Sequence, residues 1–352
     1  ENPADQRDVA PVRPSGVGRR SVGIDGCRQV SVGKGGKGTH ANRVPFDQDG
    51  GRQRNPYARS VRVSLCRRAK ILSVRTTFAD GCGDKDPIFE VYVSEDLKSW
   101  TGPYVAFQPP RGFWGVRHYW APEVFEVDGK FYMFATFKGG IGENRGTGIL
   151  VADHPAGPYR PHSDGPVTLP GCECLDGTFY EDDEGQRWIV FCHEWTEIYE
   201  GKIKALRLTR DLKASYGEPV TILNAAEMKW IRLFGDPRIE KQGYLTDAPF
   251  LYKARNGELI LLWSSYSVPN YGDAGMGGYT VAVARSKSGR IEGPWTHDER
   301  LLLDRNAGHS SLFRDFQGQL WISTHHPDTP HGQERPLFLP VEEIENGLAL
   351  RE

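Results

Sequence analysis

The sequence contains no long apolar run. None of its stretches approaches the roughly 20 consecutive apolar residues that a membrane-spanning helix needs. Its first residues also lack an apolar segment of the secretory type. These absences predict a cytoplasmic protein with no membrane partner.

The chain also lacks a surplus of positive charge. It contains 44 Lys and Arg against 46 Asp and Glu, which gives a net charge of -2. Proteins that bind phosphate backbones draw on a basic surplus. A nucleic-acid partner is therefore not expected.

Aromatic residues are scarce at the N-terminus. Residues 1–75 hold 16 Lys and Arg against 6 Asp and Glu, and their aromatic residues are Phe46 and Tyr57 alone. Because so few large apolar side chains cannot fill a sheet core, this composition predicts an irregular, disordered basic N-terminal segment over residues 1–75.

Cysteine is sparse as well, with six residues in the chain. They do not form the two Cys-x-x-Cys pairs that are typical of zinc sites, and the spacing of Cys172 and Cys174 is a weak signal by itself. We interpret the cysteines as free thiols, which is the usual state in the cytoplasm.

From residue 90 onward, one pattern recurs: a β-rich apolar run, a tight turn with glycine, and a second apolar run. The turns are Asp128-Gly129, Glu184-Gly185, Asn256-Gly257 and Gln317-Gly318. Asp-Gly and Asn-Gly between apolar runs favour β-hairpins. Regular repetition of such hairpins predicts an all-β fold, a five-bladed β-propeller over residues 76–352.

The first blade lacks part of the pattern. Val93–Pro103 resembles an outer strand, but no inner hairpin precedes it, and Asp86-Pro87 lies too close to Asp96 to hold one. We therefore expect an incomplete or irregular first blade. Back-translation of Tyr57–Arg75, read one base later, permits Met-Arg-Asp-Pro-Tyr-Val-Phe-Pro and Arg-Lys-Tyr-Tyr-Leu-Phe-Gly, which have the missing pattern. A frame shift near Arg75 is one hypothesis, and a basic arm is the other.

Acidic residues recur at one position of the repeat. The innermost strand of each blade lines the propeller axis. The alignment places Ala121, Asp176, Asp247 and His309 in one column, each followed three residues later by an apolar residue. We expect these side chains to converge at the axis, with an Asp of the shifted frame, whereas Glu173 and Glu194 are competing carboxylates.

Motifs on these strands resemble glycoside hydrolase family 43. They are Trp120-Ala-Pro-Glu123, Leu175-Asp176-Gly177, Thr246-Asp247-Ala-Pro249 and Gly308-His309. The resemblance covers roughly residues 85–345. It implies an inverting glycosidase that releases arabinofuranosyl or xylosyl residues from plant-derived oligosaccharides.

The resemblance also implies roles for particular residues. Asp247 would be the general acid, and Asp176 would orient it and raise its pKa. His309 would lie near one calcium ion, or a water molecule, on the axis. The base would be the Asp of the shifted frame, encoded at Arg59 and Ser60. The family usually has Glu at the position of Asp247 and Asp at that of Glu123.

Further residues are candidates for binding the substrate. They are Trp114, Trp120, Glu123, Arg117 and Glu194. Trp114 is favoured as a platform that stacks on a sugar, since tryptophans on inner strands belong more often to the core. Residues 139–146 and 266–278 are rich in Gly and polar residues and are expected to form part of the rim.

Two alternatives stay open at this point. A retaining β-fructosidase-like propeller would hold its two carboxyl groups about 5–5.5 Å apart, against roughly 6.5–9.5 Å in an inverting enzyme. A carbohydrate-binding propeller without turnover is the second alternative, because the chain as written lacks the base and could be inactive. The oligomeric state is left open.

Overall fold

The computed structural model describes residues 88–140, 142–237, 239–271, 277–330 and 333–351, and the backbone of three strands before them. All of these belong to the unit Ala41–Glu352, whereas the unit Glu1–His40 lies outside the described residues. The predicted disordered basic segment falls mostly outside the described residues. So do Arg59 and Ser60, where the base was predicted.

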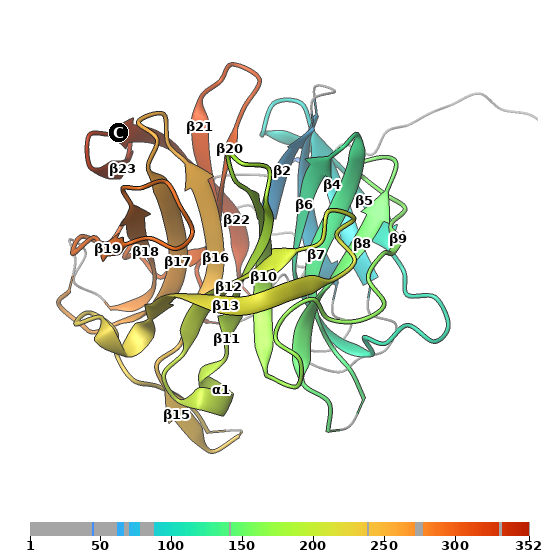
Figure 1. Cartoon of the computed structure of the whole chain (residues 1–352). Helices are drawn as coiled ribbons and strands as arrows, with labels where there is room; N and C mark the ends of the chain where they lie inside the picture. Colours follow the sequence, from blue (N-terminus) through green and yellow to red (C-terminus); the bar gives the residue numbers. More distant parts are fainter. Residues whose placement is uncertain are drawn as a thin grey trace, which may run out of the picture. The chain divides into compact units, whose positions relative to one another are not determined.

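Four antiparallel sheets of four strands repeat one topology, in which sequence neighbours are neighbours in the sheet (Figure 1). The first two sheets are β6 (Arg117–Val127), β7 (Lys130–Lys138), β8 (Arg145–Ala152) and β9 (Arg160–Pro161), and β10 (Cys174–Glu181), β11 (Arg187–His193), β12 (Lys202–Leu208) and β13 (Ser215–Asn224). The other two are β16 (Asp247–Lys253), β17 (Leu259–Ser267), β18 (Gly278–Ser286) and β19 (Trp295–His297), and β20 (Gly308–Arg314), β21 (Leu320–His326), β22 (Arg335–Ile344) and β23 (Gly347–Leu350). This repetition confirms the predicted propeller.

A fifth sheet has five strands in the order β1-β5-β4-β3-β2. They are β1 (Val44–Pro45), β2 (Arg62–Cys66), β3 (Lys70–Thr77), β4 (Ile88–Ser94) and β5 (Ser99–Phe107). The sequence predicted that the inner hairpin next to β4 is missing. In the structure, β2 and β3 form a hairpin there, and β3 pairs with β4. The predicted incomplete first blade is thus not confirmed. The domain boundary predicted at residue 76 stays a prediction, and β3 extends across it.

The smaller elements lie in the connections between strands. A two-stranded hairpin, β14 (Phe234–Asp236) with β15 (Lys241–Gly243), precedes β16. Two short helices, α1 (Trp195–Ile198) and the 3-10 helix η1 (Ala225–Glu227), follow β11 and β13. In the described part of the chain, no helix has the length and apolar character needed to cross a membrane.

The predicted turns join the first two strands of each four-stranded sheet. At the first of them, Asp128 and Gly129 both have positive φ, 50° and 76°. A two-residue turn with two positive φ angles matches the right-handed twist of the flanking strands, which explains the Asp-Gly sequence.

Every innermost strand of these four sheets contains a bulge near its start. The pairing shifts between Trp120 and Glu123, and likewise between Asp247 and Phe250. The residues at the second position of the four bulges have φ between 48° and 57°, and these are Ala121, Asp176, Ala248 and His309. The predicted column is therefore wrong at Asp247, which lies one residue earlier than the equivalent of Asp176. The sequence pattern fits either alignment, because Phe250 and Leu251 are both apolar.

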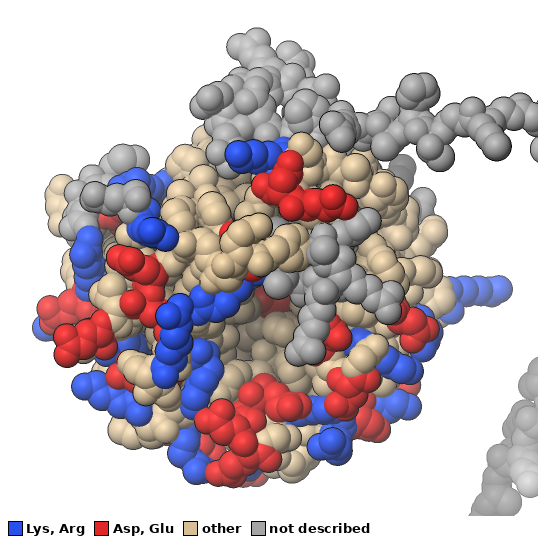
Figure 2. Space-filling view, turned by 90° about the horizontal axis from the view of Figure 1, so that it is seen from above, with Lys and Arg blue, Asp and Glu red and all other residues tan. Residues whose placement is uncertain are grey.

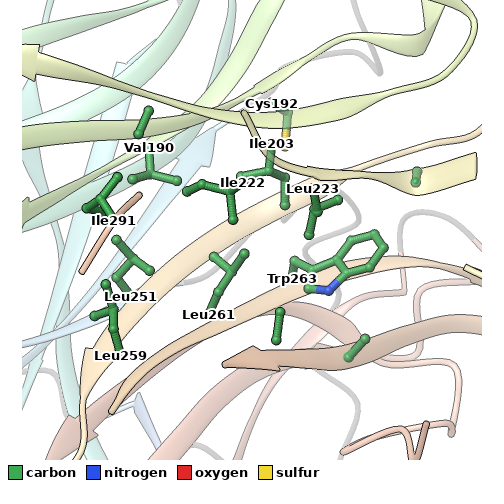
Figure 3. Packing of buried hydrophobic residues seen from close by; sticks show 14 of the residues in the cluster. Val190, Cys192, Ile203, Ile222, Leu223, Leu251, Leu259, Leu261, Trp263 and Ile291 are labelled. Carbon is green, nitrogen blue, oxygen red and sulfur yellow. The ribbon is translucent and has the colours of Figure 1, made fainter. Parts of the chain in front are cut away.

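The core consists of layers between neighbouring sheets. Val190 and Cys192 of β11 pack in the cluster that contains Leu261 and Trp263 of β17 (Figure 3). The alternate residues Ile189 and Phe191 pack in another cluster, with Phe134 of β7. Because successive side chains of a strand point to opposite faces, a blade strand buried on both faces is apolar throughout. This packing fixes where the inner strands begin.

Candidate functional site

The structure brings Asp176 and Asp247 together from neighbouring sheets. Asp176 lies at the start of β10, is 4% exposed, and accepts a hydrogen bond of 3.0 Å at Oδ2 from the backbone N–H of Ala248. Asp247 is the residue before Ala248, at the start of β16. The Asp176 carboxylate therefore holds the backbone that carries Asp247.

The surroundings of Asp247 favour its protonated form. The residue keeps part of its surface exposed. Burial of its carboxyl group raises the pKa of Asp247 well above the usual range, and the charges of Asp176 and Glu194 raise it further. The Tyr279 hydroxyl donates a hydrogen bond of 2.9 Å to Asp247 Oδ2, which acts in the opposite direction. A protonated, partly exposed carboxyl group can serve as a general acid.

A second layer of polar residues lies behind Tyr279, and the sequence contained no signal for it. The Tyr279 ring stacks on His325, with ring centroids 5.5 Å apart. Asp328 accepts a hydrogen bond of 2.7 Å from the hydroxyl of Tyr266 and lies 3.2 Å from His325 Nε2. Tyr279 is on the third strand of its sheet, far in sequence from the motifs of the inner strands.

His309 also lies at the axis. Its Nδ1 is 3.7 Å from Asp176 Oδ2, and its backbone N–H donates to Ser264 Oγ over 2.9 Å. Calcium takes six to eight oxygen ligands, whereas these contacts supply one carboxylate beside an imidazole. Within the described ranges, no cluster of three metal-binding side chains includes His309. The described donors by themselves do not fit calcium.

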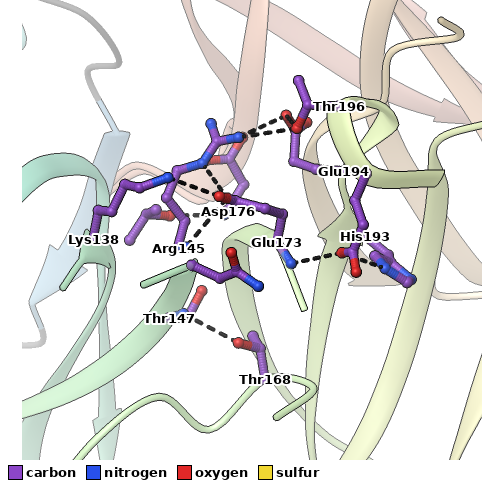
Figure 4. A network of polar contacts seen from close by, with 12 residues as sticks. Lys138, Arg145, Thr147, Thr168, Glu173, Asp176, His193, Glu194 and Thr196 are labelled. Atoms are coloured by element: carbon purple, nitrogen blue, oxygen red, sulfur yellow. Dashed lines mark hydrogen bonds and ion pairs between the residues drawn. The ribbon is translucent and has the colours of Figure 1, made fainter. Parts of the chain in front are cut away.

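Arg145 connects the buried carboxylate of Glu194 with the half-buried one of Glu173 at one side of the site (Figure 4). Its Nε lies 2.7 Å from Glu173 Oε2, and its Nη2 lies 3.0 Å from Glu194 Oε2. Lys138 adds a contact of 2.7 Å to the other oxygen of Glu173. Burial is the largest influence on Glu194 and raises its pKa, although the charge of Arg145 acts against this. Arg145 falls in the predicted rim 139–146, but its partners are remote in sequence.

Trp120 lies beside this network. The guanidinium of Arg145 lies 5.4 Å from the centre of the Trp120 ring, and the His118 ring stacks on Trp120 at 4.3 Å. Burial lowers the pKa of His118 to about 4, together with the charges of Arg145 and Lys138. His118 is therefore neutral at pH 7.

The other predicted binding residues have different surroundings. Trp114 packs against the rings of Phe113 and Phe137 in an apolar cluster, and none of its described contacts involves Asp176 or Asp247. Arg117 Nη2 donates to the carbonyl of Gly140 over 3.2 Å. Glu123 is 3% exposed and lies just after the bulge of β6. The geometry thus groups Glu194 and Trp120 with Arg145, whereas Trp114 is half-buried and packs at the edge of an apolar cluster.

A propeller that presents a carboxyl group with a raised pKa at its axis has one of the two groups that a glycosidase requires, the general acid. The model of the family "Glycosyl hydrolases family 43" matches residues 70–344. The chain belongs to glycoside hydrolase family 43, and the resemblance seen in its motifs is confirmed.

Several relatives are similar over most of the chain. The extracellular exo-alpha-(1->5)-L-arabinofuranosidase ArbA of Cellvibrio japonicus is 28% identical over 64% of this chain and 65% of its own length. Xylosidase/arabinosidase 43A of Humicola insolens is 25% identical over 66% of this chain and 73% of its own. The crystal structure of an endo-arabinase from Bacteroides thetaiotaomicron is 35% identical, with a TM-score of 0.74 over 83% of this chain and 96% of that chain. The alignment with ArbA thus spans just under two thirds of that relative.

Proposed function

We propose that this protein is an inverting glycoside hydrolase that releases arabinofuranosyl or xylosyl residues from plant-derived oligosaccharides. The observation that carries this proposal is the environment of Asp247. Burial and two neighbouring carboxylates raise its pKa, and part of its surface is open to a ligand. Such a group can protonate the oxygen of the departing sugar, the step that limits hydrolysis of a glycosidic bond.

Each part of the site has a role in this mechanism. Asp247 donates the proton, and Asp176 orients it through Ala248 and raises its pKa by like-charge repulsion. Glu194 and Trp120, with Arg145 between them, bind sugar hydroxyl groups. His309 lies next to Asp176, where the family resemblance implies a calcium ion or a water molecule. Because the described donors alone do not fit calcium, the water molecule is the one proposed here.

The five-stranded sheet is the first blade of five in this proposal. Its strand β2 lies at the end of the sheet order, and strands β2 and β3 both contact β6. The base that activates water would come from this blade, opposite Asp247. In an inverting enzyme the base and the acid stand roughly 6.5–9.5 Å apart, which leaves room for the water molecule.

The relatives support substrates that contain arabinofuranose or xylose. The names of ArbA and of xylosidase/arabinosidase 43A report these sugars. The related crystal structure is an endo-arabinase, so release of single sugars and cleavage within a chain need to be distinguished. Linear arabino-oligosaccharides serve this purpose, since an exo-acting enzyme yields monosaccharide from the first turnover.

The test compares the chain with Asp247→Asn on aryl arabinofuranosides and xylosides, with NMR of the anomeric configuration of the first product. We expect inversion and a loss of about 10²–10⁴-fold in kcat for Asp247→Asn. The loss should be smaller for leaving groups of low pKa, because these depart without a proton. Asp153→Asn is the control, since this carboxylate is 77% exposed. Retention of configuration, or equal loss for all leaving groups, would overturn the proposal.

A second candidate function is carbohydrate binding without turnover. It is favoured by the residues at the position predicted for the base, Arg59 and Ser60, which cannot act as a carboxylate base. Sequencing of the source DNA tests the frame-shift hypothesis directly. If the frame is intact and the base is absent, we expect oligosaccharide binding with turnover about 10²–10⁴-fold lower than in a chain with the frame restored. Rescue by a small anion such as formate would locate the defect at the base.

A further inference from the structure

Three side chains of types that can bind a metal ion gather beside Glu173 and Glu194. They are Cys172, His193 and Glu197. The N–H of Glu194 donates to the carbonyl of Glu173 over 2.9 Å, and both side chains turn to Arg145. Cys172 and His193 are each next in the chain to one of these glutamates. Glu197 of α1 lies with them, and its Oε2 accepts a hydrogen bond of 2.7 Å from the N–H of Glu173.

The three groups are close enough for one ion. One ligand atom from each of Cys172, His193 and Glu197 lies within 4.8 Å of the other two. His193 Nε2 is 3.0 Å from Glu197 Oε2. Two ligands of a tetrahedral Zn²⁺ are separated by about 3.3 Å for N and O and about 3.6 Å for N and S, given bonds of ~2.0–2.3 Å. An ion thus requires shifts of about 1 Å or less.

The surroundings suit an ion with one open position. Cys172 is half-buried, His193 is 7% exposed, and Glu197 is exposed, so that solvent reaches one side of the group. The Nδ1 atom of His193 is buried and has no hydrogen-bond partner among the described residues. The other ring nitrogen, Nε2, faces Glu197 and is the atom that would bind an ion.

The donor set indicates the kind of ion. A thiolate, an imidazole and a carboxylate are ligands of Zn²⁺, whereas calcium and magnesium prefer oxygen alone. With Cys172 and Glu197 ionised, the two negative charges balance Zn²⁺.

We propose that Cys172, His193 and Glu197 bind one Zn²⁺ ion, with water at the fourth position, in a site separate from the propeller axis. The ion would tie the segment before β10 to α1. The first segment contains Glu173, and α1 begins directly after Glu194; both glutamates are partners of Arg145. Zn²⁺ would therefore stabilise one wall of the carbohydrate site without contact with the substrate.

The experiment uses the full chain, treated with a chelator, dialysed against buffered Zn²⁺ and analysed for bound metal. We expect one Zn²⁺ per chain, with affinity lowered by more than roughly 100-fold in Cys172→Ser and in His193→Gln. Cys174→Ser is the matched control, since Cys174 belongs to the same strand edge but not to the ligand group. Circular dichroism shows whether each variant is folded.

Co²⁺ gives a readout that does not depend on the variants. We expect a near-ultraviolet thiolate-to-cobalt band in the parent chain, and its loss in Cys172→Ser. A chain that binds no stoichiometric Zn²⁺, or a Co²⁺ complex without the thiolate band, would overturn the proposal. Neither measurement involves hydrolysis, so a failure here leaves the proposed glycosidase function untouched.

Discussion

The two acidic regions of the site handle their charges differently. Glu173 and Glu194 share Arg145, and Lys138 also reaches Glu173. Asp247 instead has a neutral donor, the hydroxyl of Tyr279, and two negative neighbours, Asp176 and Glu194. We conclude that the first region, Glu173 and Glu194 with Arg145, pairs its carboxylates with a cation in fixed positions. The second region, Asp247 with Asp176 and Tyr279, keeps a proton available for transfer. Similar side chains thus acquire different chemistry from their partners.

Arg145→Met breaks the first region and should have the largest effect. It leaves the carboxylate of Glu194, whose side chain is 4% exposed, without its cation. Removal of one partner from a buried ion pair costs about 3–5 kcal/mol. We expect a loss of this size in chemical denaturation and a raised KM. Arg145→Lys should recover part of the stability, but the single ammonium group cannot reproduce the simultaneous contacts of Arg145 with Glu173 and Glu194. A decrease of less than about 1 kcal/mol in the free energy of unfolding would show that the ion pairs of Arg145 do not stabilise this part of the site.

Asp176→Asn changes the second region by removing a negative charge next to Asp247. It weakens the contact with Ala248 N–H that positions Asp247, and misplacement of a catalytic group costs about 10²-fold in kcat. It also removes a charge that raises the pKa of Asp247. The acid then loses its proton at lower pH. We expect the basic limb of the pH profile of kcat/KM to move to lower pH, and an unmoved limb would contradict the assignment of Asp247.

Tyr279→Phe changes the same carboxyl group in the opposite direction. The hydrogen bond from Tyr279 lowers the pKa of Asp247, so its removal raises this pKa further. We expect the basic limb to move to higher pH and kcat to fall by up to about tenfold, the effect of one hydrogen bond. Tyr132→Phe is the control on β7 of another sheet, where the ring lies beside His162. A shift in the same direction as that of Asp176→Asn would refute the model of opposing influences.

Asp247→Asn should alter the pH dependence of stability, the smallest effect. The folded-state pKa of Asp247 is raised, so the unfolded chain ionises this residue first as pH increases. Its contribution is fully present below the unfolded pKa of about 3.9 and is lost as pH rises through the folded pKa. We expect Asp247→Asn to be more stable than the parent at pH 7 and equally stable near pH 3 in urea titrations. Equal stability at both pH values would mean that the carboxyl group is not destabilised by its site.

Much of the fold was predictable from local sequence. Asp128-Gly129 adopts the two positive φ angles that a tight hairpin requires, and the glycines at the other three turns have positive φ as well. The position of Asp247 was less predictable. The bulge of β16 inserts one residue, and the apolar pair Phe250 and Leu251 conceals where it is inserted.

Trp114 and Tyr279 show the same limit for the site. Aromatic character and a place before an inner strand made Trp114 a plausible sugar platform; its ring contacts Phe113 and Phe137, and its role stays a prediction. Tyr279 had no pattern of its own, since its strand is buried nearly throughout, like other blade strands. Only its neighbour in the same sheet, Asp247 of β16, makes it functional.

The order of the strands, their turns and the presence of acidic residues at the inner strands follow from the chain, because hairpin pairing and φ preferences act over a few residues. The pKa of Asp247 and the partners of Arg145 follow from the closed arrangement of blades. Asp176 is 71 residues before Asp247, and Glu194 is 49 residues after Arg145. Electrostatic influence depends on separation in space and on burial, and packing of the blades determines both.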